Sequence, residues 1–203
     1  MTSHRFTVLT VCTGNICRSP LAQQLLSAEL RDYNVDVSSA GTCAVVGNAM
    51  DDTSARLSRE LGGRDQEAHV ARQLAADQVR AADLVLAMSR DHRRSVAELV
   101  PAAAAKTFTI RELARILTTL TPEDIATLDE GPPLTSARAL VAKAASLRGL
   151  LPRADAEAFD VVDPYAGDES LFRLSTNQIV PAVATIAEYL ALCLRQQAGA
   201  RTS

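Results

Sequence analysis

The 203-residue chain has few aromatic residues, with four Phe, three Tyr and no Trp. Alanine and leucine therefore have to fill most of the core, which favours helices. The chain also lacks an excess of positive charge, since its formal net charge is −3 and its acidic and basic residues are interspersed. We expect no nucleic-acid partner, because binding of that kind needs a basic face.

Long apolar runs are missing as well. The run that ends at Cys12 is too short for a signal-peptide core, and we expect that no later stretch approaches a membrane span. We therefore expect a cytoplasmic protein with reduced thiols and no membrane partner. The four cysteines follow no structural zinc spacing, since Cys12 and Cys17 lie five apart and Cys43 and Cys193 stand alone. Nothing in the sequence indicates an oligomeric state.

The first half of the chain alternates between strand and helix patterns. β-Branched residues alternate from Phe6 to Val11, and the apolar run from Leu84 to Met88 suits a strand buried on both faces. Strands are expected over 6–11, 35–37, 84–88 and 106–110, with helices over 20–32, 51–61 and 90–99. This order predicts an open, four-stranded parallel α/β sheet with helices on both faces.

The second half is mainly helical. Residues 111–150 are rich in Ala and Leu and are broken at Thr121-Pro122 and at 131–133. A loop precedes a long amphipathic helix over 171–194, and the polar tail from Gln196 should fray. We expect one domain over 1–203, with a helical insertion at about 111–158. The insertion could be a lid or a partner surface, but an added helical hairpin is favoured because surface loops tolerate insertions.

The segment from Cys12 to Pro20 (CTGNICRSP) joins a buried strand to the start of a helix, with Ser19 as the expected N-cap. Its backbone N–H groups lack helical partners and form a nest for a tetrahedral oxyanion, helped by the helix dipole. The same field stabilises a thiolate, so Cys12 should be nucleophilic at neutral pH. Arg18 offers a planar fork to two phosphate oxygens. Ser19 offers a donor to the thiolate, and Gly14 permits unusual backbone angles.

A buried structural cysteine beside a solvated arginine is the alternative interpretation, but it leaves most of the segment unexplained. The segment resembles the phosphate loop of the low-molecular-weight protein tyrosine phosphatase family. That loop has Cys, five residues, Arg and then Ser or Thr, often with Gly-Asn and a second Cys inside. Further similar segments follow in order, so that the resemblance covers about 6–110 and 160–194. These segments are 38–42, 69–73, 83–88 and 163–165.

The resemblance implies hydrolysis of phosphotyrosine on proteins through a cysteinyl-phosphate intermediate. Cys12 would attack phosphorus, and Arg18 and the loop amides would stabilise the transition state. Asp163 would protonate the leaving oxygen and then act as a base on water. A phosphorylated protein is the expected partner, and no metal or cofactor is implied because the amides and Arg18 replace a cation. The residues expected to form or support the loop are Thr13, Gly14, Asn15, Ile16, Cys17, Ser19, Ser39 and His69.

Two further expectations concern oxidation and substrate choice. Cys17 would capture an oxidised Cys12 as a disulfide, the alternative being that it only packs under the loop. Ile16 and Tyr165 should form walls that suit a phenyl ring, whereas the N–H donors of a guanidinium would stay unpaired there. A protein-arginine phosphatase is therefore the second candidate, because such enzymes resemble this chain at Thr13 but have Thr in place of Ile16.

Two positions depart from the family pattern. Ser89 stands where an acid commonly follows the Met of the third strand, which removes that acid's contact with the loop. Tyr165 is followed by Ala166 rather than by a second aromatic residue, which should open the cleft on that side. Arsenate reductases of this fold need further redox cysteines near the third strand, and the chain has none between positions 43 and 193. A non-catalytic phosphoprotein-binding module is the last alternative, against which the complete set of nucleophile, arginine and acid argues.

Overall fold

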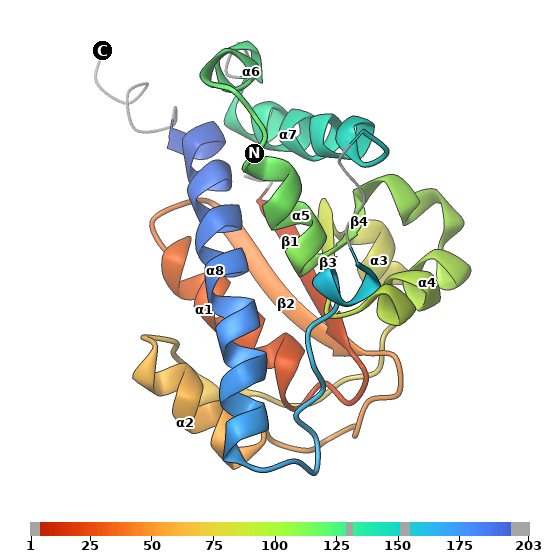
Figure 1. The fold of residues 1–203 in the computed structure, drawn as a ribbon, viewed down its shortest axis with the longest axis vertical. Helices are drawn as coiled ribbons and strands as arrows, with labels where there is room; N and C mark the ends of the chain where they lie inside the picture. Colours follow the sequence, from red (N-terminus) through yellow and green to blue (C-terminus); the bar gives the residue numbers. More distant parts are fainter. Residues whose placement is uncertain (1–4, 129–131, 151–154, 196–203) are drawn as a thin grey trace.

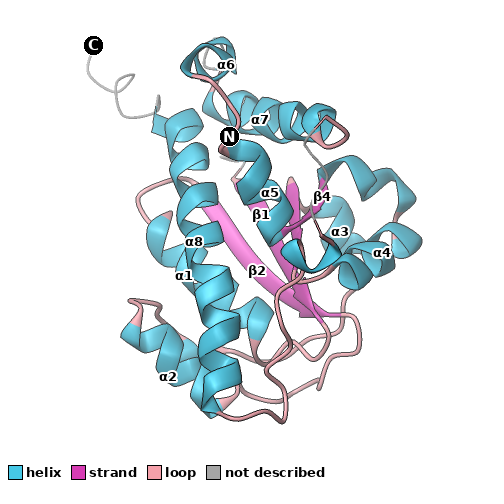
Figure 2. Ribbon diagram, viewed as in Figure 1, coloured by secondary structure: helices cyan, strands magenta, loops and turns pink. Residues whose placement is uncertain are grey.

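A four-stranded parallel sheet forms the centre of the computed structural model, which describes residues 5–128, 132–150 and 155–195 (Figure 1). Helices cover both faces of the sheet (Figure 2), so the expected fold class is confirmed. The strands pair in the order β2-β1-β3-β4. They are β1 (Phe6–Cys12), β2 (Val35–Gly41), β3 (Leu84–Ala87) and β4 (Thr107–Thr109). The tail expected to fray from Gln196 lies outside the described residues.

Alternating side chains along the strands build one apolar core on each face of the sheet. In β1, Val8 belongs to the larger core and Leu9 to the smaller one. In β3, Leu84 and Leu86 face the larger core and Val85 the smaller one. β3 is thus buried on both faces, which explains its continuous apolar sequence.

The helices divide between the two cores according to their apolar faces. The larger core contains side chains of α1 (Arg18–Glu29), α5 (Ile110–Leu117), α7 (Pro133–Leu147) and α8 (Glu169–Leu194). The smaller core contains those of α3 (Ala76–Ala81) and α4 (Arg90–Leu99). The shorter elements are α2 (Asp52–Glu60), α6 (Pro122–Leu128) and the 3-10 turns η1 (Gln66–Ala68), η2 (Pro101–Lys106) and η3 (Ala156–Ala158).

The start of α1 differs from the expected one. The helix begins at Arg18, its N-cap residue is Cys17, and the side chain of Cys17 makes no capping hydrogen bond. Ser19, the expected N-cap, lies inside the first turn, and its hydroxyl group contacts Cys12 and Asn15 of the preceding loop. Local sequence preference for a cap is thus overridden at this position.

The insertion is packed into the protein rather than simply added at its surface. Arg148, the C-cap residue of α7, lies with its guanidinium 4.1 Å from the centre of the Phe108 ring. It donates hydrogen bonds to the carbonyl oxygens of Ala104 at 3.2 Å and Thr107 at 2.6 Å. These contacts fix α7 against β4. The helix also buries one face in the larger core, through Ser136, Ala137, Leu140, Val141 and Ala144.

Helix α8 runs along the larger core, where it contacts α1, α5 and α7 (Figure 1). It starts after the N-cap residue Asp168 and continues through Pro181. By length and composition α8 is apolar enough to cross a membrane, which corrects the expectation that no stretch approaches such a span. Half of that apolar window is buried inside the protein, as in the core helix of a globular domain.

Candidate active site

A pocket of about 200 Å³ opens where β1 ends and α1 begins. This is the carboxyl edge of the parallel strands, where open α/β sheets place their ligands. The pocket brings together residues from the expected phosphate loop after β1, from the segment after β2 and from the loop before α8. Its lining residues are Cys12, Thr13, Gly14, Ile16, Cys17, Arg18, Cys43, Val45, Asp163 and Tyr165.

The Cys12 thiol is buried at the base of this pocket, with its Sγ 2.9 Å from Ser19 Oγ. Ser19 Oγ also accepts a hydrogen bond from Asn15 Nδ2 at 3.0 Å. Because that bond uses a lone pair of the oxygen, the hydroxyl hydrogen is directed elsewhere, and the sulfur is closer than Ala40 O at 3.5 Å. Ser19 Oγ thus lies within hydrogen-bonding distance of the thiol, and its hydroxyl hydrogen has two acceptors within reach, the sulfur and Ala40 O. The first-turn amides of α1 add their dipole.

Asn15, rather than Gly14, takes the unusual backbone conformation of the loop. Asn15 has a φ of 57°, whereas Gly14 is not among the residues with positive φ. Asn enters this left-handed region because its short amide bonds locally. Here Nδ2 donates to Ser19 Oγ and to Ser39 Oγ at 2.9 Å, and Oδ1 accepts from the Arg72 N–H at 2.9 Å. The expectation for Gly14 was wrong, and the amide of Asn15 fixes the loop.

Two neighbouring segments support the loop from outside. His69 Nε2 lies 2.7 Å from Asn15 O, and burial lowers the pKa of His69. Gly41 ends β2, which extends beyond its expected end at residue 37. A Cβ at Gly41 would lie 2.4 Å from Thr13 O, so only glycine lets β2 come this close to the loop. The supporting roles expected for Ser39 and His69 agree with these contacts.

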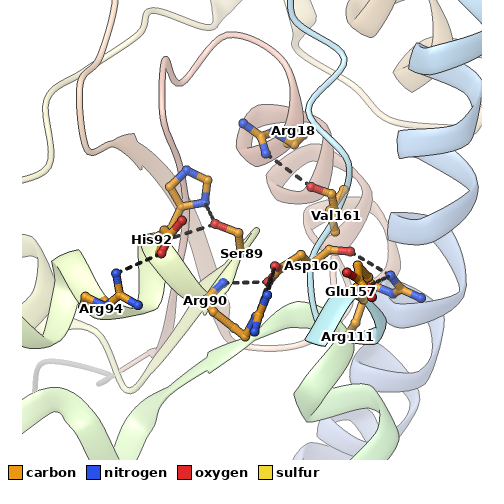
Figure 3. A network of polar contacts seen from close by, with 10 residues as sticks. Arg18, Ser89, Arg90, His92, Arg94, Arg111, Glu157, Asp160 and Val161 are labelled. Carbon is orange, nitrogen blue, oxygen red and sulfur yellow. Dashed lines mark hydrogen bonds and ion pairs between the residues drawn. The ribbon is translucent and has the colours of Figure 1, made fainter. Parts of the chain in front are cut away.

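Arg18 and Asp163 meet across the pocket although they lie 145 positions apart in the chain. Arg18 is 5% exposed, and its Nη2 lies 2.5 Å from Asp163 Oδ2. Its Nη1 donates to Val161 O at 3.3 Å (Figure 3). The side chain of Asp163 is half exposed, so it is open to the pocket that Cys12 also lines. The structure thus brings together the three residues expected to carry the chemistry.

A contact that was not predicted joins α4 to the phosphate loop. His92 Nε2 lies 2.8 Å from Thr13 Oγ1. The other ring nitrogen, His92 Nδ1, lies 2.8 Å from Ser89 Oγ (Figure 3). Burial, with a smaller effect of the Arg18 charge, lowers the pKa of His92 to about 4, so its ring is neutral near pH 7. Ser89 also caps α4 by accepting the His92 N–H. Ser89 replaces the acid that commonly contacts this loop, but it still contacts the loop indirectly, through His92. The available signal was a Ser-x-x-His spacing directly after a buried strand.

The expected walls of the pocket, Ile16 and Tyr165, both line it. Val45 and Cys43 also line it and were not expected, because the segment after β2 carries no motif. Ala166, next to Tyr165, has a φ of 59°, which is uncommon for a residue with a Cβ. The rim of the pocket is thus mostly apolar.

Cys17 is buried under the loop and packs with Leu57 and Phe172. Burial, and to a lesser extent the charge of Asp51, raises the pKa of the Cys17 thiol to about 12. Cys17 also lines the pocket beside Cys12. Cys17 therefore packs under the loop. Any redox reaction of Cys17 near pH 7 would start from its protonated thiol.

The fold and the site define a phosphatase of the low molecular weight class. A family model for low molecular weight phosphotyrosine protein phosphatases matches residues 7–121, and the chain belongs to this family. The match continues past the expected limit at residue 110. The matched region therefore includes helix α5.

Curated relatives agree with this assignment, and solved structures share the fold. The chain is 42% identical over 100 residues to AmsI of Erwinia amylovora, named a probable low molecular weight protein-tyrosine-phosphatase, across 49% of this chain and 67% of the relative. It is 40% identical over 100 residues to Etp of Escherichia coli K12, across 49% and 66%. The crystal structure of AmsI superposes with a TM-score of 0.64 at 24% identity, covering 93% of this chain and 95% of AmsI. The YwlE arginine phosphatase of Geobacillus stearothermophilus gives 0.64 at 25% identity, covering 98% and 99%.

Proposed function

We propose that this chain hydrolyses phosphotyrosine on proteins, with Cys12 as the nucleophile, Arg18 as the phosphate clamp and Asp163 as the acid. The observation that carries the proposal is the single pocket that these three side chains share at the start of α1. The names of AmsI and Etp as protein-tyrosine phosphatases support the same activity. The partner is a phosphorylated protein, and the proposed location is the cytoplasm, where Cys12 stays reduced.

In the first step the Cys12 thiolate attacks phosphorus in line with the phenolic leaving oxygen. The S–P bond forms, the P–O bond to the tyrosine breaks, and Asp163 gives its proton to the departing oxygen. Arg18 has five N–H donors, of which the contacts with Asp163 and Val161 use two. Its remaining donors and the loop amides bind the equatorial phosphate oxygens, where negative charge is concentrated in the transition state.

In the second step water attacks the cysteinyl-phosphate. Asp163, now a carboxylate, takes a proton from that water, the S–P bond breaks, and inorganic phosphate is released. Cys12 leaves as a thiolate, which Ser19 Oγ at 2.9 Å and the first turn of α1 stabilise. The same groups therefore serve the nucleophile in one step and the leaving group in the other.

Release of inorganic phosphate from a phosphotyrosine peptide and from a chromogenic aryl phosphate tests this function. An enzyme turns both over repeatedly. A phosphoprotein-binding module would bind the peptide without releasing phosphate, and that result would overturn the proposal.

A protein-arginine phosphatase is the second candidate, because a structural neighbour of the chain is an arginine phosphatase. Ile16 argues against it, since this side chain lines the pocket and offers no acceptor to a guanidinium. Leaving those donors unpaired costs about 1–3 kcal/mol. We therefore expect phosphotyrosine to be preferred over phosphoarginine. Phosphoserine should be poor, because its short stem does not reach the loop past these walls.

Replacement of Ile16 by Thr should shift the ratio of kcat/KM values toward phosphoarginine by about tenfold, because the new hydroxyl accepts a guanidinium hydrogen bond. Peptides that carry each phosphorylated residue give the measurement. The matched control is Ile16→Val, which stays apolar and should keep the original preference. A parent protein that already prefers phosphoarginine would contradict the argument from Ile16 without affecting the role of Cys12.

Oxidation provides a test of Cys17. Peroxide converts the Cys12 thiolate to a sulfenic acid, and attack by the Cys17 sulfur then forms a disulfide and releases water. Activity lost to peroxide should return on treatment with a dithiol in the parent protein and return poorly in Cys17→Ala. Because the Cys17 thiol has a pKa of about 12, capture should become faster as the pH rises.

The control for this experiment is Cys43→Ala, since Cys43 is an exposed thiol that lines the same pocket. Recovery should remain normal in that variant. Equal recovery in all three proteins would leave Cys17 with a packing role alone. Loss of recovery in Cys43→Ala instead would make Cys43 the partner of Cys12.

A further inference from the structure

Asp160, three residues before the proposed acid Asp163, forms an ion pair with Arg90 of α4 (Figure 3). Arg90 places its Nη2 2.8 Å from Asp160 Oδ2, and its Nε lies 3.1 and 3.2 Å from the two carboxylate oxygens. The backbone N–H of Arg90 adds a bond to Oδ1 at 2.8 Å. The side chain and the main chain of Arg90 thus both bind the Asp160 carboxylate, and together they fix its position and its orientation.

A second arginine, from α5, holds the main chain of the same segment. Arg111 Nη1 donates to the carbonyl oxygen of Asp160 at 2.7 Å and to that of Glu157 at 3.0 Å (Figure 3). Asp160 is therefore fixed twice, through its carboxylate by α4 and through its carbonyl by α5. These two helices flank the segment from different cores of the protein.

The two residues between Asp160 and Asp163 are also held by hydrogen bonds. The Val161 N–H donates to Met88 O at 2.8 Å, and Val161 O accepts from Arg18. The Val162 N–H donates to Gln178 Oε1 at 2.8 Å. Residues 165–170, on the far side of Asp163, are exposed. On that side the Tyr165 N–H donates to Asp163 Oδ1 at 3.2 Å. The position of Asp163 is thus determined by Arg18, by this local bond and by the anchored chain that precedes it.

We propose that Arg90 and Arg111 are positioning residues for the acid: they hold the segment 157–161 so that Asp163 reaches the leaving group beside Arg18. This inference rests on the proposed role of Asp163. Neither arginine lines the pocket, so each would act through the loop that carries Asp163 and not on the substrate. Small displacements matter here, because misplacement by about 1 Å can cost about 10²-fold in rate.

The alternative is that Arg90 and Asp160 form an ordinary surface ion pair. Their side chains are 43% and 29% exposed, and exposed pairs of this kind contribute little to stability. The two interpretations differ in what they predict for catalysis. Only a positioning role makes the defect depend on how much the leaving group needs a proton.

Kinetics of Arg90→Ala on a series of aryl phosphates separate these interpretations. For esters with poor leaving groups kcat should fall about tenfold, whereas for activated esters it should change less than about twofold, because only the former need protonation. Inhibition by inorganic phosphate should stay unchanged, since the phosphate loop is intact. Arg111→Ala should show the same pattern. Arg90→Lys should be intermediate, because it keeps the charge but loses the fork.

The matched control is Arg94→Ala, one turn further along α4. Arg94 is exposed and pairs with Asp91 of its own helix, and its removal should leave every rate unchanged (Figure 3). Thermal unfolding of each variant shows whether a lost rate is due to lost folding. Asp160→Asn is a milder change that removes the same ion pair. Asp163→Asn is measured in the same series as the reference for a missing acid.

Two results would overturn the inference, and they are distinguishable. If Asp163→Asn depends on the leaving group while Arg90→Ala and Asp160→Asn lose rate uniformly or not at all, the positioning role is wrong and the acid stands. If Asp163→Asn itself shows no such dependence, the proposed acid is wrong and the positioning role falls with it.

Discussion

Replacement of Cys12 by Ser is expected to abolish turnover while phosphate binding remains. The seryl hydroxyl does not ionise near neutral pH, so neither Ser19 nor the start of α1 can make it a nucleophile. The amides of the loop and Arg18 are untouched, so the oxyanion site survives. We expect kcat to fall by at least about 10⁴-fold, or about 5 kcal/mol of barrier. Aryl phosphate hydrolysis gives the rate, and calorimetry with inorganic phosphate gives the binding.

Two further variants complete this experiment. Arg18→Ala should lose both binding and turnover, because the guanidinium acts in the ground state and in the transition state. Cys193→Ser makes the same chemical change in α8, within the larger core, and should keep the catalytic rate. If Cys12→Ser retained activity within about tenfold, or about 1.4 kcal/mol, Cys12 would not be the nucleophile.

Replacement of Asp163 by Asn should cut the rate by about 10²–10³-fold for esters with poor leaving groups and only a few-fold for activated ones. Asn is nearly isosteric and can still accept a hydrogen bond from Arg18, but it has no proton to give. One limb of the pH profile of kcat should flatten, because the general acid is gone. Rates for a series of substituted phenyl phosphates, each measured across pH, give both results.

Asp168→Asn is the matched control for this experiment. Asp168 lies in the same loop but caps α8, where it accepts the Leu171 N–H. Its replacement should change stability slightly and leave the dependence on leaving group unaltered. A uniform loss of rate in Asp163→Asn would show that the Asp-Pro turn matters for structure and not for proton transfer.

Most of the fold could be predicted because its signals are local. The apolar run at 84–88 defines a doubly buried strand, and the helix at 90–99 begins and ends where its pattern does. The expected phosphate loop has a strong sequence motif, and the structure places it between a buried strand and a helix as expected. The role of Asp163 was predicted through resemblance and not through periodicity, since Asp-Pro by itself is an ordinary turn signal.

The remaining features depend on contacts between distant segments. The left-handed backbone of Asn15 is stabilised by Ser39 and Arg72, so glycine was the natural but wrong choice from the sequence. The contact between His92 and Thr13 spans 79 positions, which no local pattern reports. Ser19 failed as an N-cap for a related reason. Its hydroxyl serves Cys12 and Asn15, and functional sites are where local rules are expected to break.

The docking of α7 has a consequence for self-association. β4 ends the sheet on one side, and the last strand of a sheet is a template on which a second chain can add its own strand. Arg148 donates a hydrogen bond to the carbonyl oxygen of Thr107 and lies over the Phe108 ring, so that carbonyl is not free to pair with another strand. β4 is also only three residues long, which leaves little length for a foreign strand to pair with. Through Arg148, α7 thus covers part of the β4 edge of the sheet, where a second copy of the chain would otherwise find free backbone groups.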